Sequence, residues 1–345
     1  MKRATAAREI IETVIGENRV RGTYHRPAQC ESPAPGQNRS SIGVLFVNPG
    51  VLPRAGTGDS AVYWADSFAK AGYPSFRFDL PGLGESHGDL PNEVIDFQCK
   101  VNDGEYAPAL SGIADYLVDR YTLGGIVVLA HCAGAVSALY AGSANAAIKG
   151  LVLLDPYFYV QQSIAKRNLI THWHMRMIRR MEDADDHHTV RSRFRGARLK
   201  MFLLTRGLYL FLKEIRRRAL HSALPGNANL PLIRCWNQLV SGRIPILVLR
   251  ASMATSKAGE FDYFGYLMPA SSRNNRLTVV TIEGATHTFA EVSGRDAVRR
   301  LSESWLREFF PLTQDISREP YREHNLASSH GSRKRPPEIA AGLHS

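Results

Sequence analysis

The chain has 345 residues, of which 44% are hydrophobic, so it is long enough for one large domain with an insertion. Its four cysteines are widely scattered and form no CxxC pair, which favours free thiols in a reducing compartment over a disulfide framework. The N-terminus lacks the apolar region of a signal peptide, and no apolar stretch reaches the length of a membrane span. We therefore expect a cytoplasmic protein, either soluble or peripherally attached to a membrane.

The net charge of +11 is concentrated in one part of the chain. Residues 157–243 contain 17 Lys and Arg against 5 Asp and Glu, a local balance of +12, which leaves −1 for the remainder. A segregated basic segment of this kind indicates an anionic partner more strongly than a diffuse positive charge would.

Apolar runs rich in β-branched residues alternate with helix-like segments along the chain. Strands are predicted at residues 9–15, 19–24, 42–47, 74–79, 126–130, 149–155, 245–250 and 277–282. Helices are predicted at residues 58–72, within 103–121, after residue 134 and at 295–310. This alternation predicts βαβ units and a mainly parallel central sheet with helices on both faces.

The fifth of these strands ends in the run Ala130-His131-Cys132-Ala133-Gly134, followed by a helical segment. This is the layout of a nucleophile elbow, usually Gly-x-Ser-x-Gly, with Cys132 at the nucleophile position. Small neighbours are needed there because the turn forces the nucleophile into a strained backbone conformation. The alternative is that Cys132 is simply a small, buried apolar residue.

A histidine, His287, follows the last predicted strand, where an α/β-hydrolase has its catalytic histidine. It would take the thiol proton of Cys132 and later protonate the leaving group. The acid of the triad is expected just after residue 250, but residues 251–255 contain no carboxylate. We rank Asp262 first, Glu260 second and Asp155, at the end of an earlier strand, third; Asp155 could equally cap a loop or helix.

An oxyanion hole requires two backbone N–H donors. Ala133, directly after the nucleophile position, would give one. Val51, in the loop after the strand at 42–47, would give the other. We expect no cofactor and no metal, and we interpret the histidines of the basic segment as surface residues: His172, His174, His187 and His188.

The run AGYPSFRFDLPGLGES at residues 71–86 resembles the serine-aminopeptidase-like α/β-hydrolases. The cysteine elbow, residues 150–156 and residues 53–56 resemble a narrower branch, the exosortase A system-associated hydrolases. The likeness covers about residues 40–310 and implies an α/β-hydrolase fold with a helical cap insertion. It also implies a cytoplasmic-type hydrolase with a cysteine nucleophile, found with exopolysaccharide and protein-sorting genes. The chain departs from the pattern in its alanine-led elbow and in the missing acid near Thr255.

Four segments follow from this resemblance and from composition. Residues 1–156 and 244–310 form the hydrolase core, and residues 157–243 form the basic helical cap. The polar tail at 311–345 cannot bury enough apolar surface to order itself. The cap would contact an acyl carrier protein, a coenzyme A thioester or an anionic membrane surface, or would simply have a solvated basic face. The basic segment contains no nucleic-acid-binding motif, so nucleic acid is not an expected partner.

The sequence thus predicts a cysteine-nucleophile acyl hydrolase or acyltransferase acting on an ester or thioester. The alternative is a non-catalytic protein of the same fold that binds an acyl or anionic partner. The intact Cys132 and His287 favour the enzyme, and the missing acid favours the binding protein.

Overall fold

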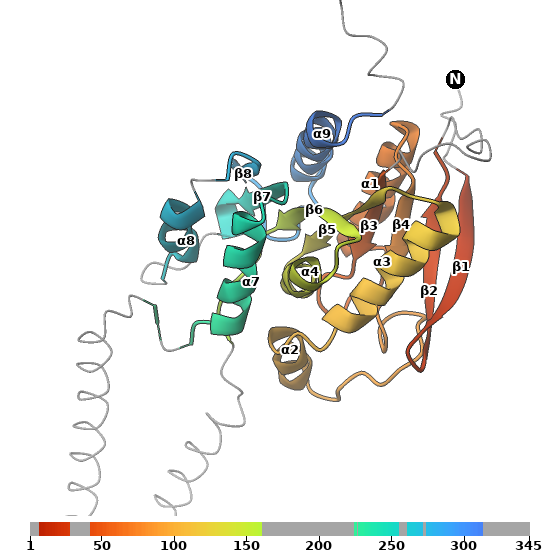
Figure 1. Cartoon of the computed structure of the whole chain (residues 1–345), viewed down its shortest axis with the longest axis horizontal. Coiled ribbons are helices and arrows are strands. Elements are labelled where there is room, and N and C mark those ends of the chain that lie inside the picture. The colour runs from red at the N-terminus through yellow and green to blue at the C-terminus, as the bar shows by residue number, and fades with distance from the viewer. Residues whose placement is uncertain are drawn as a thin grey trace, which may run out of the picture.

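The computed structural model describes residues 7–27, 42–160, 224–225, 227–254, 261–271 and 274–312. In these ranges one sheet contains eight strands in the order β1-β2-β4-β3-β5-β6-β7-β8 (Figure 1). Their bounds are β1 (Arg8–Ile15), β2 (Asn18–His25), β3 (Ile42–Val47), β4 (Ser75–Phe78), β5 (Gly125–His131), β6 (Ile148–Leu154), β7 (Ile246–Ala251) and β8 (Leu277–Ile282). The hairpin β1–β2 and the pair β2–β4 are antiparallel, and the other five pairs are parallel. The predicted mainly parallel sheet is confirmed.

The central strands are apolar on both faces, as a sheet covered by helices requires. Every residue of β5 is buried. Alternate side chains point to opposite faces, so Ile126 and Val128 belong to one apolar cluster while Val127 and Leu129 belong to the other. Two cores therefore lie back to back across the sheet.

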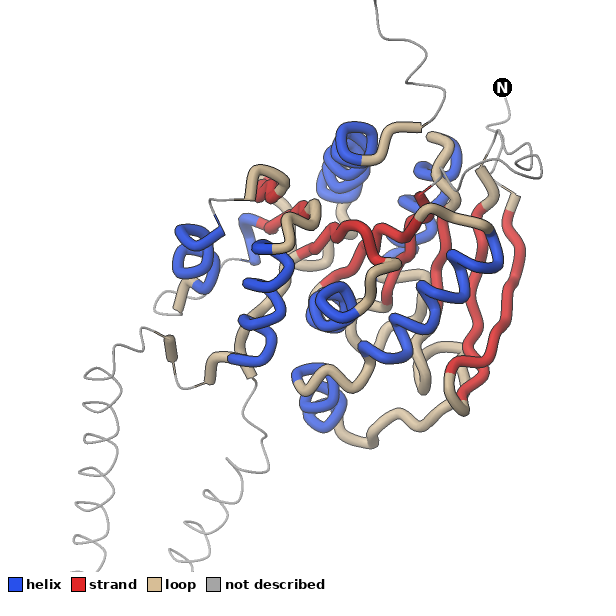
Figure 2. Tube along the Cα trace, in the orientation of Figure 1, coloured by secondary structure: helices blue, strands red, loops and turns tan. Residues whose placement is uncertain are grey.

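Helices cover both faces of the sheet, as Figures 1 and 2 show. Helices α1 (Ser60–Lys70) and α9 (Val292–Phe309) pack on one face, where Phe68 and Trp305 join the cluster of β3, β5 and β7. Helices α3 (Ala107–Tyr121), α4 (Ala133–Ala144) and α7 (Leu230–Ser241) pack on the other face. Helix α2 (Val94–Asn102) contacts α4, and α8 (Tyr263–Ser271) contacts α7.

The predicted helices at 58–72 and 295–310 correspond to α1 and α9, with ends that differ by one to three residues. Gly72, predicted to end the first of them, has φ 101°, a conformation that glycine adopts at little cost. Helices α2 and α8 were not predicted because each has only nine residues, too few to establish a helical period.

The predicted C-terminal boundary of the cap, residue 243, does not coincide with the edge of the packed structure. Residues 230–241 form α7, which packs on α4, and its Trp236 is fully buried beside the rings of Phe158 and Phe264, so this end of the 157–243 segment packs with the core. Residues 161–223 lie outside the described part of the chain, so the cap as a unit stays a prediction. The predicted disordered tail also lies outside it beyond residue 312.

None of the helices described by the structure is long and apolar enough to cross a bilayer. In the described ranges Cys99, Cys132 and Cys235 form no disulfide. The same ranges contain no group of three or more His, Cys, Asp and Glu side chains that could hold a metal ion.

A buried histidine ties the hairpin to α1. His25 of β2 is fully buried, and its Nδ1 lies 2.7 Å from Oδ1 of Asp66. Arg77 Nε donates to His25 Nε2 at 2.8 Å, so the ring is neutral and its own proton, on Nδ1, faces Asp66. Burial lowers the pKa of His25 to about 4, and the positive charge of Arg77 acts in the same direction.

This depressed pKa predicts a loss of stability in mild acid. The unfolded histidine binds a proton near pH 6.5 and the folded one near pH 4, so the free energy of unfolding falls as the pH drops from 6.5 to 4. The loss through His25 is on the order of 3 kcal/mol.

Urea unfolding of the wild type and of His25→Gln at several pH values measures this loss. We expect the variant to be less stable at pH 7 and to lose less stability between pH 6.5 and 4 than the wild type. Parallel curves for the two proteins would contradict the assignment.

Candidate active site

Cys132 lies between β5 and α4 in a left-handed backbone conformation, with φ 53° and ψ −116°. This conformation is strained for a residue other than glycine, and such strain is often found at functional sites. The surrounding backbone fixes it: Cys132 N–H donates to Leu154 O at 2.9 Å, and Cys132 O accepts from Ala135 N at 3.0 Å. This is the geometry expected of a nucleophile elbow.

The small residues around Cys132 allow a loop to approach it closely. A Cβ on Gly134 would lie 2.5 Å from the carbonyl oxygen of Asn48, a contact that no side chain can make. Asn48 begins the loop of residues 48–54, which follows β3. Gly134 therefore brings this loop against the N-terminus of α4.

His287 follows β8 and meets the carboxylate of Asp155. His287 Nδ1 lies 3.0 Å from Asp155 Oδ2. The other oxygen, Asp155 Oδ1, accepts from Ala251 N at 2.9 Å, and Asp155 N donates to Leu249 O at 2.9 Å. Asp155 has φ 43°, a second strained residue at the same edge of the sheet. These contacts hold the carboxylate in one orientation towards the imidazole.

The charges around His287 favour its protonated form. The hydrogen bond with Asp155, followed by the interaction with the Cys132 side chain, raises the pKa of His287 to about 10. At neutral pH the imidazolium is thus placed between a carboxylate and the thiol. That arrangement can stabilise a thiolate and can deliver a proton to a leaving group.

The carboxylate that contacts His287 differs from the one we ranked first. Asp262 lies at the cavity wall, and no ion pair joins it to His287 in the described residues. Glu260 lies outside these residues. Asp155, ranked third, makes the contact because β6 is the neighbour of β7 in the sheet and ends at the same edge. The empty window at 251–255 was the signal that the acid comes from the other strand.

His131 is a buried neighbour of His287 to which sequence analysis gave no role. Its ring is buried and lies 4.9 Å from the ring of His287 and 5.8 Å from that of Phe289. Burial, and then the charge of His287, lower the pKa of His131 to about 4. Its Nε2 has no hydrogen-bond partner in the described part of the chain. A neutral ring thus supports one side of His287 without adding a competing charge.

The two residues proposed to give the oxyanion hole its backbone N–H groups, Val51 and Ala133, both line the same cavity. Ala133 is the first residue of α4, so its N–H has no partner inside the helix, and Val51 lies at the tip of the 48–54 loop. Neither N–H donates to another group among the residues that the structure describes. The positive end of the helix dipole at Ala133 adds to the attraction for an oxyanion.

The cavity over Cys132 has a volume of about 950 Å³ and an aromatic wall. Its rings come from Phe97, Tyr157, Phe158, Tyr159, Phe261, Tyr263 and Phe264. Burial, and then the proximity of Cys132, raise the pKa of Tyr157, so its hydroxyl stays neutral and close to the thiol. Arg250 also lines the cavity, with its guanidinium 4.8 Å from the ring centre of Phe264. Such a wall suits an apolar or aromatic acyl group.

The sequence profile of the alpha/beta hydrolase family matches residues 44–301 of this chain. The chain belongs to the alpha/beta hydrolase family. The match includes the elbow, Asp155 and His287, so the described site lies inside the family's region. No curated protein matches the chain in sequence.

Solved structures show the same fold. An esterase from Pyrococcus furiosus has 14% identity and a TM-score of 0.55, over 88% of this chain and 92% of that chain. The alpha/beta hydrolase GrgF from Penicillium sp. sh18 has 12% identity and a TM-score of 0.53, over 89% of this chain and 100% of that one. TT1662 from Thermus thermophilus has 12% identity and a TM-score of 0.52, over 89% and 99%. At these identities the likeness establishes the fold, and the expected alpha/beta hydrolase fold is confirmed.

Replacement of the contacting carboxylate should change the titration of His287. Asp155→Asn removes the largest cause of the raised pKa, so we expect the pKa of His287 to fall from about 10 towards 6.5. Asp262→Asn is the matched control and should leave it unchanged. The measurement is an NMR titration of ¹⁵N-labelled histidine. If Asp262→Asn lowered the pKa of His287 and Asp155→Asn did not, Asp262 would be the acid that interacts with His287.

Proposed function

We propose that this alpha/beta hydrolase is a cysteine-dependent acyl hydrolase or acyltransferase acting on an ester or thioester. The observation that carries the proposal is the strained Cys132 beside a His287 that is hydrogen-bonded to Asp155. A merely buried cysteine would have no reason to occupy the left-handed region at the start of a helix. We assign Cys132 as nucleophile, His287 as acid–base and Asp155 as the acid that orients His287.

In the first half of the reaction the sulfur of Cys132 attacks the carbonyl carbon while His287 holds the thiol proton. The carbonyl electrons move to oxygen, where the N–H groups of Val51 and Ala133 stabilise the negative charge. Collapse of this intermediate breaks the bond to the alcohol or thiol, which leaves with the proton from His287. The products of this half are the free alcohol or thiol and an acyl group on Cys132.

In the second half water, or an acceptor alcohol or amine, attacks the acyl carbon and gives its proton to His287. The carbon–sulfur bond breaks, and the proton returns to the Cys132–His287 pair. Water gives hydrolysis and another acceptor gives acyl transfer. The resemblance of the elbow to the exosortase A system-associated hydrolases supports a cysteine nucleophile and belongs to this proposal.

The alternative, a non-catalytic binding protein, rested on the absence of a carboxylate at residues 251–255. Asp155 supplies a carboxylate to His287 from another strand, so that reason no longer favours the alternative.

Removal of the sulfur tests the nucleophile. Cys132→Ala should reduce turnover of an aryl ester or acyl thioester by about 10³-fold or more, the scale seen when a triad nucleophile is removed. Cys132→Ser should also have low turnover, because a hydroxyl needs more assistance from the base than a thiol does. Steady-state kinetics measure both.

Two cysteines outside the cavity provide matched controls. Cys99→Ala and Cys235→Ala should keep the turnover of the wild type, because neither thiol lines the cavity. Full activity in Cys132→Ala would contradict covalent catalysis.

The second part of the proposal concerns the partner of the basic segment, whose cationic cluster at Arg216, Arg217 and Arg218 lies outside the described residues. An acyl carrier protein, a coenzyme A thioester or an anionic membrane surface would supply the complementary charge. Such an interaction is screened over about 8–10 Å at ordinary ionic strength.

Neutralising the three arginines together should weaken binding of a coenzyme A thioester or an anionic vesicle, with an effect that fades as salt rises. Turnover of a small uncharged ester should stay within about twofold, because the cluster is not part of the proton-transfer groups. Binding titrations over a salt series, with the uncharged ester as control, measure this. Equal losses on charged and uncharged substrates would contradict an electrostatic role.

A further inference from the structure

The tip of the loop that carries Val51 is exposed and loosely held, so the position of Val51 depends on how the ends of the loop are fixed. We call residues 48–54 the oxyanion loop. At its tip the side chains of Val51 and Leu52 are 42% and 40% exposed. The backbone–backbone hydrogen bond described across this turn, from Leu52 N to Pro49 O, is long at 3.4 Å. An oxyanion hole, in contrast, needs its donors within a fraction of an ångström of the right place.

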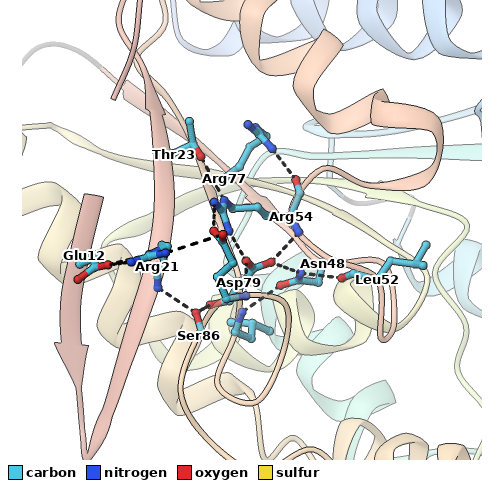
Figure 3. Close-up of polar contacts among 11 residues, drawn as sticks. Glu12, Arg21, Thr23, Asn48, Leu52, Arg54, Arg77, Asp79 and Ser86 are labelled. Carbon is cyan, nitrogen blue, oxygen red and sulfur yellow. Dashed lines mark hydrogen bonds and ion pairs between the residues drawn. The ribbon is translucent and has the colours of Figure 1, made fainter. Parts of the chain in front are cut away.

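A buried carboxylate holds both ends of this loop. Asp79 follows β4 and is fully buried. Its Oδ1 accepts from Asn48 Nδ2 at 2.9 Å and from Arg54 N at 2.6 Å. Its Oδ2 accepts from the Arg54 guanidinium and from Glu85 N at 3.1 Å. Figure 3 shows Asp79 at the centre of these contacts.

Asn48 links the same carboxylate to the tip of the loop. Its Nδ2 donates to Leu52 O at 2.7 Å as well as to Asp79. Its Oδ1 accepts from Leu80 N at 3.0 Å, which fixes the amide orientation. Val51 therefore lies between two residues, Asn48 and Leu52, that are both positioned through Asp79.

Arg54 anchors the other end of the loop in the sheet. Its Nε donates to Thr23 Oγ1 of β2 at 3.1 Å, and its second guanidinium nitrogen pairs with Glu85. Its carbonyl oxygen accepts from Arg77 Nη1 at 3.0 Å. Because Arg77 is itself held by His25, the loop is tied to the interior of the sheet.

The chain closes over Asp79 at a glycine. Gly84 has φ 53°, and a Cβ there would lie 2.4 Å from the Asp79 carboxylate. The turn of residues 80–86 can thus approach the carboxylate only with glycine at this position. All four hydrogen bonds to the Asp79 carboxylate are donated by N–H groups. Both carboxylate oxygens must therefore act as acceptors, and the negative charge strengthens these bonds.

We propose that Asp79 is a positioning residue for the oxyanion hole, acting through Asn48 and Arg54 on the N–H of Val51. Asp79 touches neither Cys132 nor the cavity, so it acts only through the loop. The inference rests on the proposed acyl transfer at Cys132, because it assigns the device that prepares that site for the tetrahedral intermediate.

The substitution Asp79→Asn keeps the size of the side chain and places an amide NH₂ against two N–H donors. We expect the acylation rate and kcat to fall about 100-fold, the scale of losing one oxyanion donor, with KM within about threefold of the wild type. The pH limbs of kcat/KM should stay in place, because His287 and Asp155 are unchanged. A rapid-quench assay with a p-nitrophenyl ester, read by mass spectrometry, gives the acylation rate.

Glu12→Gln is the matched control, because Glu12 pairs with Arg19 and Arg21 of the hairpin and makes none of the described contacts to Asp79, Asn48 or Arg54. It should stay within about twofold of the wild type. Arg54→Lys is a second test that keeps the positive charge but cannot make the three side-chain contacts of the guanidinium. Arg54→Lys should also lower kcat. If Asp79→Asn does not fold, the kcat of Arg54→Lys is the result that tests the proposal.

Wild-type kcat in folded Asp79→Asn, or in Arg54→Lys when Asp79→Asn fails to fold, would overturn the inference. A shift of the pH limbs, or a loss confined to KM, would also overturn it. Failure of the proposed function looks different, because the wild type itself would then form no acyl adduct on Cys132.

Discussion

The site depends on the left-handed backbone at Cys132. With φ 53°, the chain leaves a fully buried strand and enters α4 within one residue, so the thiol and the first N–H groups of the helix lie at the same edge of the sheet. The conformation holds because Leu154 accepts the Cys132 N–H and because Gly134 leaves room for the carbonyl of Asn48. One strained residue thus brings together the Cys132 thiol, proposed as the nucleophile, the N-terminus of α4 and the 48–54 loop.

Environment, rather than residue type, assigns different roles to the two neighbouring histidines. His131 is buried without a carboxylate, so burial keeps it neutral. His287 meets Asp155, so its pKa is raised and it carries a proton at neutral pH, as the proposed chemistry requires. Asp79 provides a second fixed charge, buried and fully hydrogen-bonded, whose effect is on the shape of the loop that carries Val51.

Much of the fold follows from the sequence because the central strands are apolar throughout and alternate with helical segments. The elbow and His287 could be located because they follow strands whose ends lie at one edge of a parallel sheet. The contact of Asp155 with His287 could not be predicted from the sequence, because the pairing of β6 with β7 decides which strand end faces His287. The surroundings of His131 and Asp79 could not be predicted either, because they arise from burial and from contacts between residues far apart in the chain.

The most direct test of the account is to trap the acyl-enzyme. Wild-type protein is quenched within milliseconds of mixing with a p-nitrophenyl ester, and the intact mass and the modified peptide are determined. The account predicts a mass increase of one acyl group, located on the peptide that contains Cys132, at a rate that matches or exceeds turnover. Turnover without an adduct, or an adduct only at Cys99 or Cys235, would contradict it.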